Sequence, residues 1–267
     1  QLLALMNSAG YELLKEYDWR ALQKEYRFYT QAYQYTGYTV EGSYQITGMS
    51  STAGLNDKFM LTGNGIDQDT SIVSVDSAVQ ITINTKATAT GFATFTFGQT
   101  KYDLPPDYET ITDRTQWDKT KHWEMLGPED AQQWQWLKSG YISTGPRVRW
   151  RILGEYFQIW PIMNTQEYLG FEYRSKAWAE SSTGLPKNSF TADTDTTILD
   201  DRLMVMLTKL KYFQIKNFDT TALQQTYDRY LSVVKANDKG APNLSFAPYP
   251  SKVLIGYANI PDTGYGS

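Results

Sequence analysis

Residues 145–161 read GPRVRWRILGEYFQIWP, a stretch with the pattern of a β-hairpin. Its two halves, 148–153 and 156–160, are rich in β-branched and aromatic residues, which favour strands. Gly154 supplies the backbone freedom that a two-residue hairpin turn requires. Pro161 has no N–H to donate and therefore ends the second strand. The sequence thus predicts two antiparallel strands joined by a tight turn.

Three arginines alternate with apolar residues in the first strand of this hairpin. The arginines are Arg147, Arg149 and Arg151, and the apolar residues are Val148, Trp150 and Ile152. Because successive side chains of a strand point to opposite faces, the three guanidinium groups share one face. That face is either simply solvated, or it binds acidic side chains of a partner protein, since arginine makes forked bonds to carboxylates. Binding of nucleic-acid phosphates is a third interpretation.

Four other stretches have patterns typical of helices. Apolar residues at steps of three and four begin at Leu2, and the pattern continues through Trp19 and Leu22, where the helix either runs on or kinks. The same spacing recurs twice after residue 195, and a shorter helix is expected between the first helix and the hairpin. The expected ranges are 2–17, 128–139, 199–213 and 223–234.

Capping residues mark where the later helices begin. Pro128 suits the first position of the second helix. Asp195 or Thr197 is the expected cap of the third helix, and Asp219 is that of the fourth. A third strand is predicted at 168–173, where alternate residues are apolar.

The composition changes sharply between Gly37 and Gln99. Only 7 of these 63 residues are charged, and none is Trp or Pro. Runs of β-forming residues alternate with turn signals such as the one around Asn64. Strands are expected at 45–48, 58–62, 71–75, 80–84 and 93–97. We interpret residues 37–98 as an inserted all-β domain, either Ig-like or a small sandwich, although one sheet continuous with the rest of the chain is the alternative.

The last residues, 241–267, contain four prolines and many large apolar side chains. Leaving those side chains in water costs free energy, and a packed domain rarely ends in so long an irregular stretch. We expect an extended arm that packs on a neighbouring chain; a disordered tail and an arm packed on its own domain are the alternatives. The side chains expected to make the contact are Phe246, Tyr249, Tyr257, Ile260 and Tyr265.

Composition excludes several classes of protein. The chain has 267 residues, 25 basic against 29 acidic, for a net charge of −4, so a general nucleic-acid binder is not expected. The absence of Cys excludes disulfide scaffolds, thiol catalysis and Cys-ligated zinc. No apolar run reaches the ~18 residues of a membrane span, and no export signal opens the chain. Aromatic residues make up 15%, which indicates either an aromatic core or protein contacts.

No constellation of residues predicts an enzyme. The sequence has neither a phosphate-binding loop nor a nucleophile elbow. The single histidine, His122, follows Lys121 and is interpreted as a surface or interface residue. Asp67, Asp69 and Asp76 can offer oxygens to Ca²⁺, but their spacing is not that of an EF-hand, and aspartates in turns usually bond the local backbone. We therefore predict no catalytic residue, no cofactor and no metal.

Six stretches, taken in order, resemble the head-to-tail adaptor proteins of short-tailed bacteriophages, which are also called head completion or tail-tubular-type proteins. They cover most of 1–36 and 99–240. The stretches are LLALMNSAGYELLKEYDW (2–19), YDLPPDY (102–108), TQWDKTKHWEMLGPEDAQQWQWL (115–137), GPRVRWRILGEYFQIWP (145–161), GFEYRSKAW (170–178) and FTADTDTTILDDRL (190–203). The insert departs from the simpler members of the family, although its TGNGID and TSIVSVDS runs look like a β-module of phage structural proteins.

The resemblance implies an α+β chain. Its mainly helical adaptor core, with a β-hairpin or small sheet, comprises residues 1–36 and 99–240. The inserted all-β domain at 37–98 and the extended arm at 241–267 are joined to this core. Such adaptors form a dodecameric ring beneath the portal protein and extend the channel through which DNA passes without sequence-specific binding. They offer a platform to tail nozzle, tailspike or fibre proteins. The implied location is the head-tail junction of the virion, after assembly in the host cytoplasm, with no contact to a membrane.

Two other functions fit the same composition. One is a cell-wall or glycan-binding tail protein, with or without weak hydrolase activity, that uses an aromatic-rich surface. The other is a tail-fibre or baseplate component. Under the leading interpretation, the expected partner-binding residues are the three arginines of the hairpin and the apolar residues of the arm.

Overall fold

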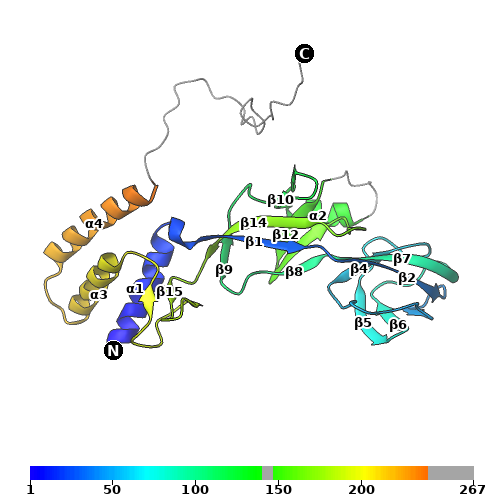
Figure 1. Cartoon of the computed structure of the whole chain (residues 1–267), viewed down its shortest axis with the longest axis horizontal. Helices are drawn as coiled ribbons and strands as arrows, with labels where there is room; N and C mark the ends of the chain where they lie inside the picture. The colour runs from blue at the N-terminus through cyan, green and yellow to red at the C-terminus, as the bar shows by residue number, and fades with distance from the viewer. Residues whose placement is uncertain (140–146, 240–267) are drawn as a thin grey trace, which may run out of the picture.

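The structure is a computed structural model that describes residues 1–139 and 147–239. Figure 1 shows an elongated chain with three parts along its length: a helical region, a central region of sheets, and a β-module. Strand residues outnumber helical ones, at 34% against 26%. The helices are α1 (Leu2–Glu16), α2 (Ala131–Lys138), α3 (Asp201–Ile215) and α4 (Thr221–Lys239), and a 3₁₀ turn spans Arg20–Leu22.

The expectation of a mainly helical core is wrong, because the chain becomes extended soon after α1. Two strands that the helical interpretation missed, β1 (Gln23–Tyr29) and β2 (Ala32–Thr39), follow the 3₁₀ turn. In β1 the exposed and partly buried residues alternate strictly, and Tyr26 and Phe28 lie on the inner side. This period of two is typical of a strand. The strand β1 pairs with β14 (Tyr168–Ser175), which is about 140 residues away in sequence.

Two antiparallel sheets form the central region. Residues of β1 pair with β14 from Gln23↔Arg174 to Tyr29↔Tyr168. The first sheet also contains β9 (Tyr108–Ile111), β10 (Trp117–Asp118) and β11 (Trp123–Glu124), and the second contains β8 (Lys101–Asp103), β12 (Arg149–Leu153) and β13 (Tyr156–Trp160). The predicted hairpin is confirmed as β12 and β13, and the predicted third strand as β14.

Stacked aromatic rings fill the space between the two central sheets. Trp150 of β12 and Phe157 of β13 have ring centroids 5.4 Å apart, and Phe157 lies 4.9 Å from Phe171 of β14. All three side chains are at most 1% exposed. Burial of such large rings is a main source of stability, so this cluster joins the hairpin to the first sheet.

The short helix expected at 128–139 is confirmed, but it begins at Ala131. Its cap is Asp130, whose Oδ1 accepts a hydrogen bond of 2.7 Å from the N–H of Gln133. Pro128 therefore precedes the helix. The preceding residues run beside β12 instead, since the N–H of Glu129 donates to the carbonyl of Trp150 at 3.1 Å.

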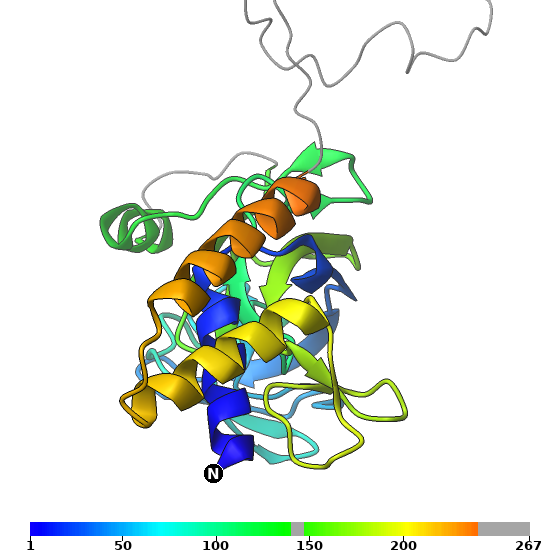
Figure 2. The same cartoon turned by 90° about the vertical axis from the view of Figure 1, so that its left-hand side faces the viewer.

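Helices α1, α3 and α4 share one buried core that includes Trp19 and Trp178, and Figure 2 shows α3 and α4 side by side with α1 crossing them. The predicted helices are confirmed here, but the cap of α3 is Asp200, whose Oδ1 accepts from the N–H of Leu203 at 2.7 Å. Asp219 accepts from the N–H of Thr221 where α4 begins. The three short strands of this region are β15 (Ala179–Glu180), β16 (Pro186–Lys187) and β17 (Thr196–Thr197).

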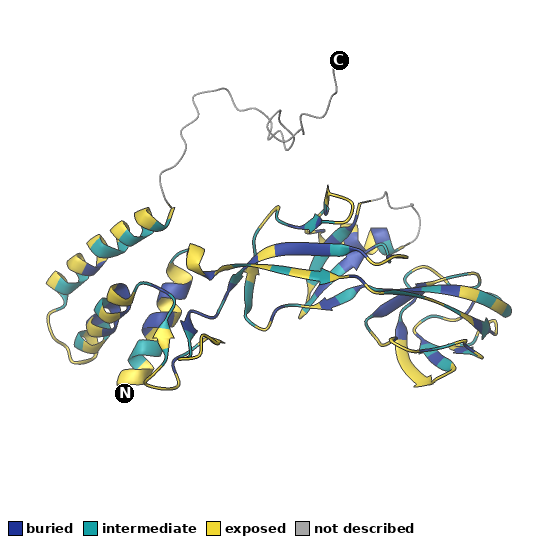
Figure 3. Ribbon diagram, in the orientation of Figure 1, coloured by how far each residue is buried: buried dark blue, intermediate teal, exposed yellow. Residues whose placement is uncertain are grey.

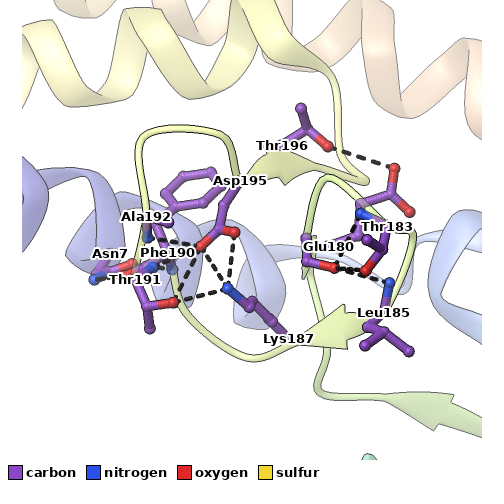
Figure 4. Close-up of polar contacts among 11 residues, drawn as sticks. Asn7, Glu180, Thr183, Leu185, Lys187, Phe190, Thr191, Ala192, Asp195 and Thr196 are labelled. Atoms are coloured by element: carbon purple, nitrogen blue, oxygen red, sulfur yellow. Dashed lines mark hydrogen bonds and ion pairs between the residues drawn. The ribbon is translucent and has the colours of Figure 1, made fainter.

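Asp195 does not cap α3 because its carboxylate holds the preceding loop together (Figure 4). It accepts hydrogen bonds from the N–H groups of Thr191 and Ala192 and from Lys187 Nζ at 2.7–2.9 Å. The Lys187 ammonium, followed by the two backbone donors, holds the pKa of this carboxyl far below its usual range. Asn7 of α1 exchanges two hydrogen bonds with the backbone at residue 190, which ties the loop to the helix.

The β-module is one six-stranded antiparallel sheet that curves until its end strands approach. Its order is β4-β7-β2-β3-β6-β5, and the N–H of Leu61 donates to the carbonyl of Thr70 at 3.0 Å across the end strands. The five strands expected from sequence are confirmed, and β2 is added before them. The module contains β2, β3 (Gln45–Thr47), β4 (Phe59–Thr62), β5 (Ile72–Ser77), β6 (Gln80–Ile83) and β7 (Gly91–Gln99).

The chain enters and leaves the β-module side by side. Ala32 of β2 pairs with Gly98 of β7, and the N–H of Gln99 donates to the carbonyl of Gln31 at 2.9 Å. Inside the module, Phe59, Phe95 and eight other large apolar residues are buried together. Figure 3 shows that burial is concentrated along the inner faces of the three parts, so the module has a core of its own.

Candidate functional site

The arginine row lies on β12 and immediately before it, with the alternation that the sequence predicts. Val148 and Trp150 are 2% and 1% exposed, whereas Arg147 is exposed and Arg149 and Arg151 are half-buried. The guanidinium groups therefore face away from the aromatic core, on the outer face of the second sheet.

Only one of the three arginines has an acidic partner within the described residues. Arg149 Nη1 lies 2.5 Å from Glu129 Oε1, and the Glu129 side chain is only 8% exposed. A buried carboxylate needs such a partner, so Arg149 stabilises the segment before α2. Arg147 and Arg151 form no ion pair in the part of the chain that the structure describes, and they are the members of the row that a partner can reach.

The other predicted contact residues, Phe246, Tyr249, Tyr257, Ile260 and Tyr265, lie outside the described residues. The role of the arm therefore stays a prediction.

His122 occupies an exposed turn between β10 and β11. Its backbone has φ of +57°, in the left-handed region, and its ring makes no hydrogen bond within the described ranges. The neighbouring Trp123 is 39% exposed. This is the environment of a surface turn.

The three aspartates of the β-module do not converge on one point. Asp69 pairs with Lys138 of α2 at 2.7 Å, and Asp76 accepts from the hydroxyls of Ser74 and Thr82, which lower its pKa. The backbone carbonyl of Asp67 accepts from a threonine hydroxyl. Among residues 1–139 and 147–239, no group of three or more His, Asp or Glu side chains is placed to hold a metal ion.

Asp107 explains why one of the resembling stretches, YDLPPDY, matters to the fold. The carboxylate accepts from Lys24 Nζ, Ser175 Oγ and the Tyr173 hydroxyl at 2.7–2.8 Å. Burial acts to raise the pKa of Asp107, but these hydrogen bonds outweigh it and hold the pKa below its usual range. The carboxylate thereby ties β1 to β14 at the edge of an open cleft of about 450 Å³.

A surface that the sequence analysis missed lies on the helical region. Several large apolar side chains remain in water there, although a helix that packs on one side normally exposes polar residues on the other. They are Leu2 (62% exposed), Leu3 (47%), Val205 (65%), Tyr212 (44%), Ile215 (66%) and Phe218 (56%). The signal was available, because the last four lie off the apolar stripe that defines α3.

A second exposed apolar site lies on the β-module, away from the helices. Phe92 of β7 is 76% exposed, and its ring lies 4.9 Å from that of Tyr38 on β2. Val40 and Tyr44 nearby in sequence are each 47% exposed. Apolar side chains therefore reach water at both ends of the elongated chain.

A pair of buried carboxyl groups lies where the central sheets meet the β-module. Asp118 and Glu167 are each 2% exposed, and their carboxyl groups are neighbours. One oxygen of each, Asp118 Oδ2 and Glu167 Oε2, is buried without a hydrogen-bond partner among the described residues, while the other Glu167 oxygen pairs with Lys121. The N–H of Thr30, between β1 and β2, donates to the carbonyl of Glu167, and the N–H of Glu167 donates to the Thr30 hydroxyl.

Burial and the neighbouring carboxyl group both disfavour the ionised form of Glu167. Burial raises the pKa of Glu167, and the neighbouring Asp118 raises it further, although Lys121 opposes both. Because the pKa is higher in the folded than in the unfolded chain, folding takes up a proton. The stabilisation is complete below the usual glutamate pKa and is lost as the pH rises through the folded value.

Glu167→Gln is expected to remove this pH dependence, because the amide donates to Asp118 at every pH. The variant should be more resistant to urea than the parent chain at pH 8, and the difference should shrink at pH 5. The measurement is the urea midpoint between pH 5 and 8. Glu172→Gln, at an exposed position of β14, is the matched control and should leave the parent profile unchanged. Parallel profiles for Glu167→Gln and the parent chain would contradict the raised pKa of Glu167.

No helix within the described ranges has the length and apolar character needed to cross a bilayer. A scan against known protein families finds no family that matches this chain. A search of curated proteins likewise finds no similar protein.

Proposed function

We propose that this chain is a structural protein of a virion, which forms a ring between the portal and the tail and offers a platform to tail proteins. The observation that carries the proposal is the set of large apolar side chains exposed on the helical region. Soluble chains that act alone rarely expose such patches, which usually mark contacts with other chains. In a closed ring, each copy covers part of its neighbour, and many modest contacts add up.

The resembling stretches, which led to the proposal, contain residues that hold the framework of this chain together. The stretch at 102–108 supplies Asp107, and the stretch at 145–161 forms the hairpin. The stretches at 170–178 and 190–203 supply Trp178 and the cap Asp200. The resemblance therefore concerns residues with definite packing roles rather than a shared composition.

The β-module is the part we assign to the platform for tail proteins. Its own core and its paired entry and exit strands let it project from the central sheets. Its exposed aromatic pair, Phe92 and Tyr38, offers an apolar contact at the end remote from the helices. Aromatic side chains are enriched at protein contacts.

The proposal predicts the native mass of the assembled protein. Twelve copies of 30.5 kDa should give a species of about 370 kDa, alone or bound to the portal of the same virion. Native mass spectrometry measures this directly. A trimer would instead support a fibre component. A monomer that does not bind the portal but binds cell-wall glycan would support the glycan-binding alternative. The exposed side chains of Trp123 and Trp136 favour that alternative.

A further inference from the structure

An apolar groove of about 440 Å³ lies between α1 and α3. Two of its residues, Leu2 and Val205, are more than 60% exposed, and only Lys209 carries a charge. The groove is lined by Leu2, Met6, Met204, Val205, Thr208, Lys209 and Tyr212. Covering such a surface with apolar side chains is favourable at about 25 cal/mol per Å² of apolar area removed from water.

The C-terminal residues have the complementary composition. Residues 241–261 contain a single charged side chain, Lys252. Eight of them are large and apolar: Leu244, Phe246, Tyr249, Val253, Leu254, Ile255, Tyr257 and Ile260. Prolines at 242, 248 and 250 favour an extended chain, which is a shape that fits a groove between two helices.

The groove and the point from which these residues depart lie at opposite ends of α1. Lys239, at the end of α4, is held at the C-terminal end of α1, where its carbonyl accepts a hydrogen bond from Arg20 and its ammonium lies over the Tyr17 ring. The groove is lined by Leu2 and Met6, at the N-terminal end. Figure 1 shows the same opposition, with the N-terminus and the last turn of α4 at different ends of the helical region.

We propose that residues 244–257 of one copy occupy the α1–α3 groove of the next copy in the ring. Each copy then inserts its C-terminal segment, which departs from one end of its helical region, into one neighbour. Its own groove, at the other end of that region, holds the segment of the other neighbour. Contacts between two different surfaces of this kind generate closed rings when the rotation closes. The inference rests on the proposed ring and names the segment and the surface that join its members.

The lengths allow this exchange. Helix α1 has 15 residues and is therefore about 22 Å long. The 28 residues after Lys239 span up to about 90 Å when extended. A segment that long passes the end of its own helical region and reaches a neighbour. Once one contact of the ring has formed, the others become effectively intramolecular and therefore stronger.

The absence of cysteine allows the contact to be tested in the full chain. Val205→Cys places a thiol in the groove, and Ser251→Cys places one within the apolar segment. The two single variants are mixed before ring assembly and treated with a short bismaleimide. We expect a cross-linked dimer of one copy of each, with about tenfold more product than from the control mixture of Val73→Cys and Ser251→Cys. Val73 is similarly exposed, at 55%, but lies on the β-module.

Three outcomes would overturn the inference, and they separate it from the proposed function. Rings that form without selective cross-linking at residue 205 would overturn the docking site alone. When a chain that carries both cysteines is diluted into an excess of the parent chain before assembly, we expect the cross-link between residues 205 and 251 to disappear. A cross-link that persists within the one chain would show that the segment occupies its own groove. If no ring forms by native mass, alone or with portal, then the proposed function fails together with the inference.

Discussion

Gly10→Ala is expected to destabilise the helical region by about 1–3 kcal/mol, although alanine is the better helix former. A Cβ atom at Gly10 would lie 2.3 Å from two carbon atoms of the Trp178 indole. Trp178 is fully buried and cannot retreat freely, because Phe190 packs edge-on against it at 4.7 Å. The added methyl group must therefore displace a close-packed ring, and that cost exceeds the gain in helix propensity.

The measurement is the urea dependence of the helical circular dichroism signal, since most helical residues belong to this region. Ser8→Ala, two residues earlier on the exposed side of α1, is the matched control. It also increases helix propensity, although by less than a glycine replacement does, and it does not meet the indole, so its midpoint should stay at or slightly above that of the parent chain. A Gly10→Ala midpoint equal to that of Ser8→Ala would show that the indole is not closely packed against the helix.

This contact illustrates how far periodicity can predict a core. Spacing in the sequence correctly places Leu13 on the buried face of α1 and predicts the helices that pack against it. It assigns no role to Trp178, which lies beyond the end of β14 and fills the space above Gly10. A close approach between segments about 170 residues apart depends on the tertiary arrangement, which local patterns do not encode.

The error in fold class has a similar cause. The expectation of a mainly helical core came from the family resemblance, and the apolar spacing through Leu22 left open whether the first helix runs on or kinks. The alternation of β1 around Tyr26 and Phe28 was nevertheless visible in the sequence. The partner of β1 is β14, and no local signal predicts so distant a pairing. The inserted strands were easier to predict because short turns separate several of them, as in the hairpin of β5 and β6.

The arginine row shows the same limit at a candidate site. The alternation of charged and apolar residues predicted which face each side chain occupies. It could not predict that Glu129, which lies within the range expected for the second helix, would lie beside Arg149. A residue offered as a partner contact therefore has a structural role within its own chain.

Arg149→Met is accordingly expected to destabilise the chain by about 2–3 kcal/mol at pH 7. Removal of the guanidinium leaves the Glu129 carboxylate, which is 8% exposed, without its partner. A buried charge that loses its partner costs more than the net contribution of the pair, because its desolvation is no longer offset. The double variant Arg149→Met/Glu129→Gln should recover most of the loss, which urea unfolding followed by tryptophan fluorescence would measure.

Arg151→Met is the matched control on the same strand, and it separates stability from partner binding. Arg151 forms no ion pair in the described part of the chain, so its replacement should change the free energy of unfolding by less than about 0.5 kcal/mol. If the row binds acidic side chains of a neighbour, the same variant should weaken ring assembly, and raised salt should weaken the parent ring in the same way. Equal losses of stability in the two variants would contradict the structural role of Arg149. If Arg151→Met and Arg147→Met both assemble as the parent chain does, these arginines are simply solvated. The apolar surfaces are then the contacts that hold the copies together.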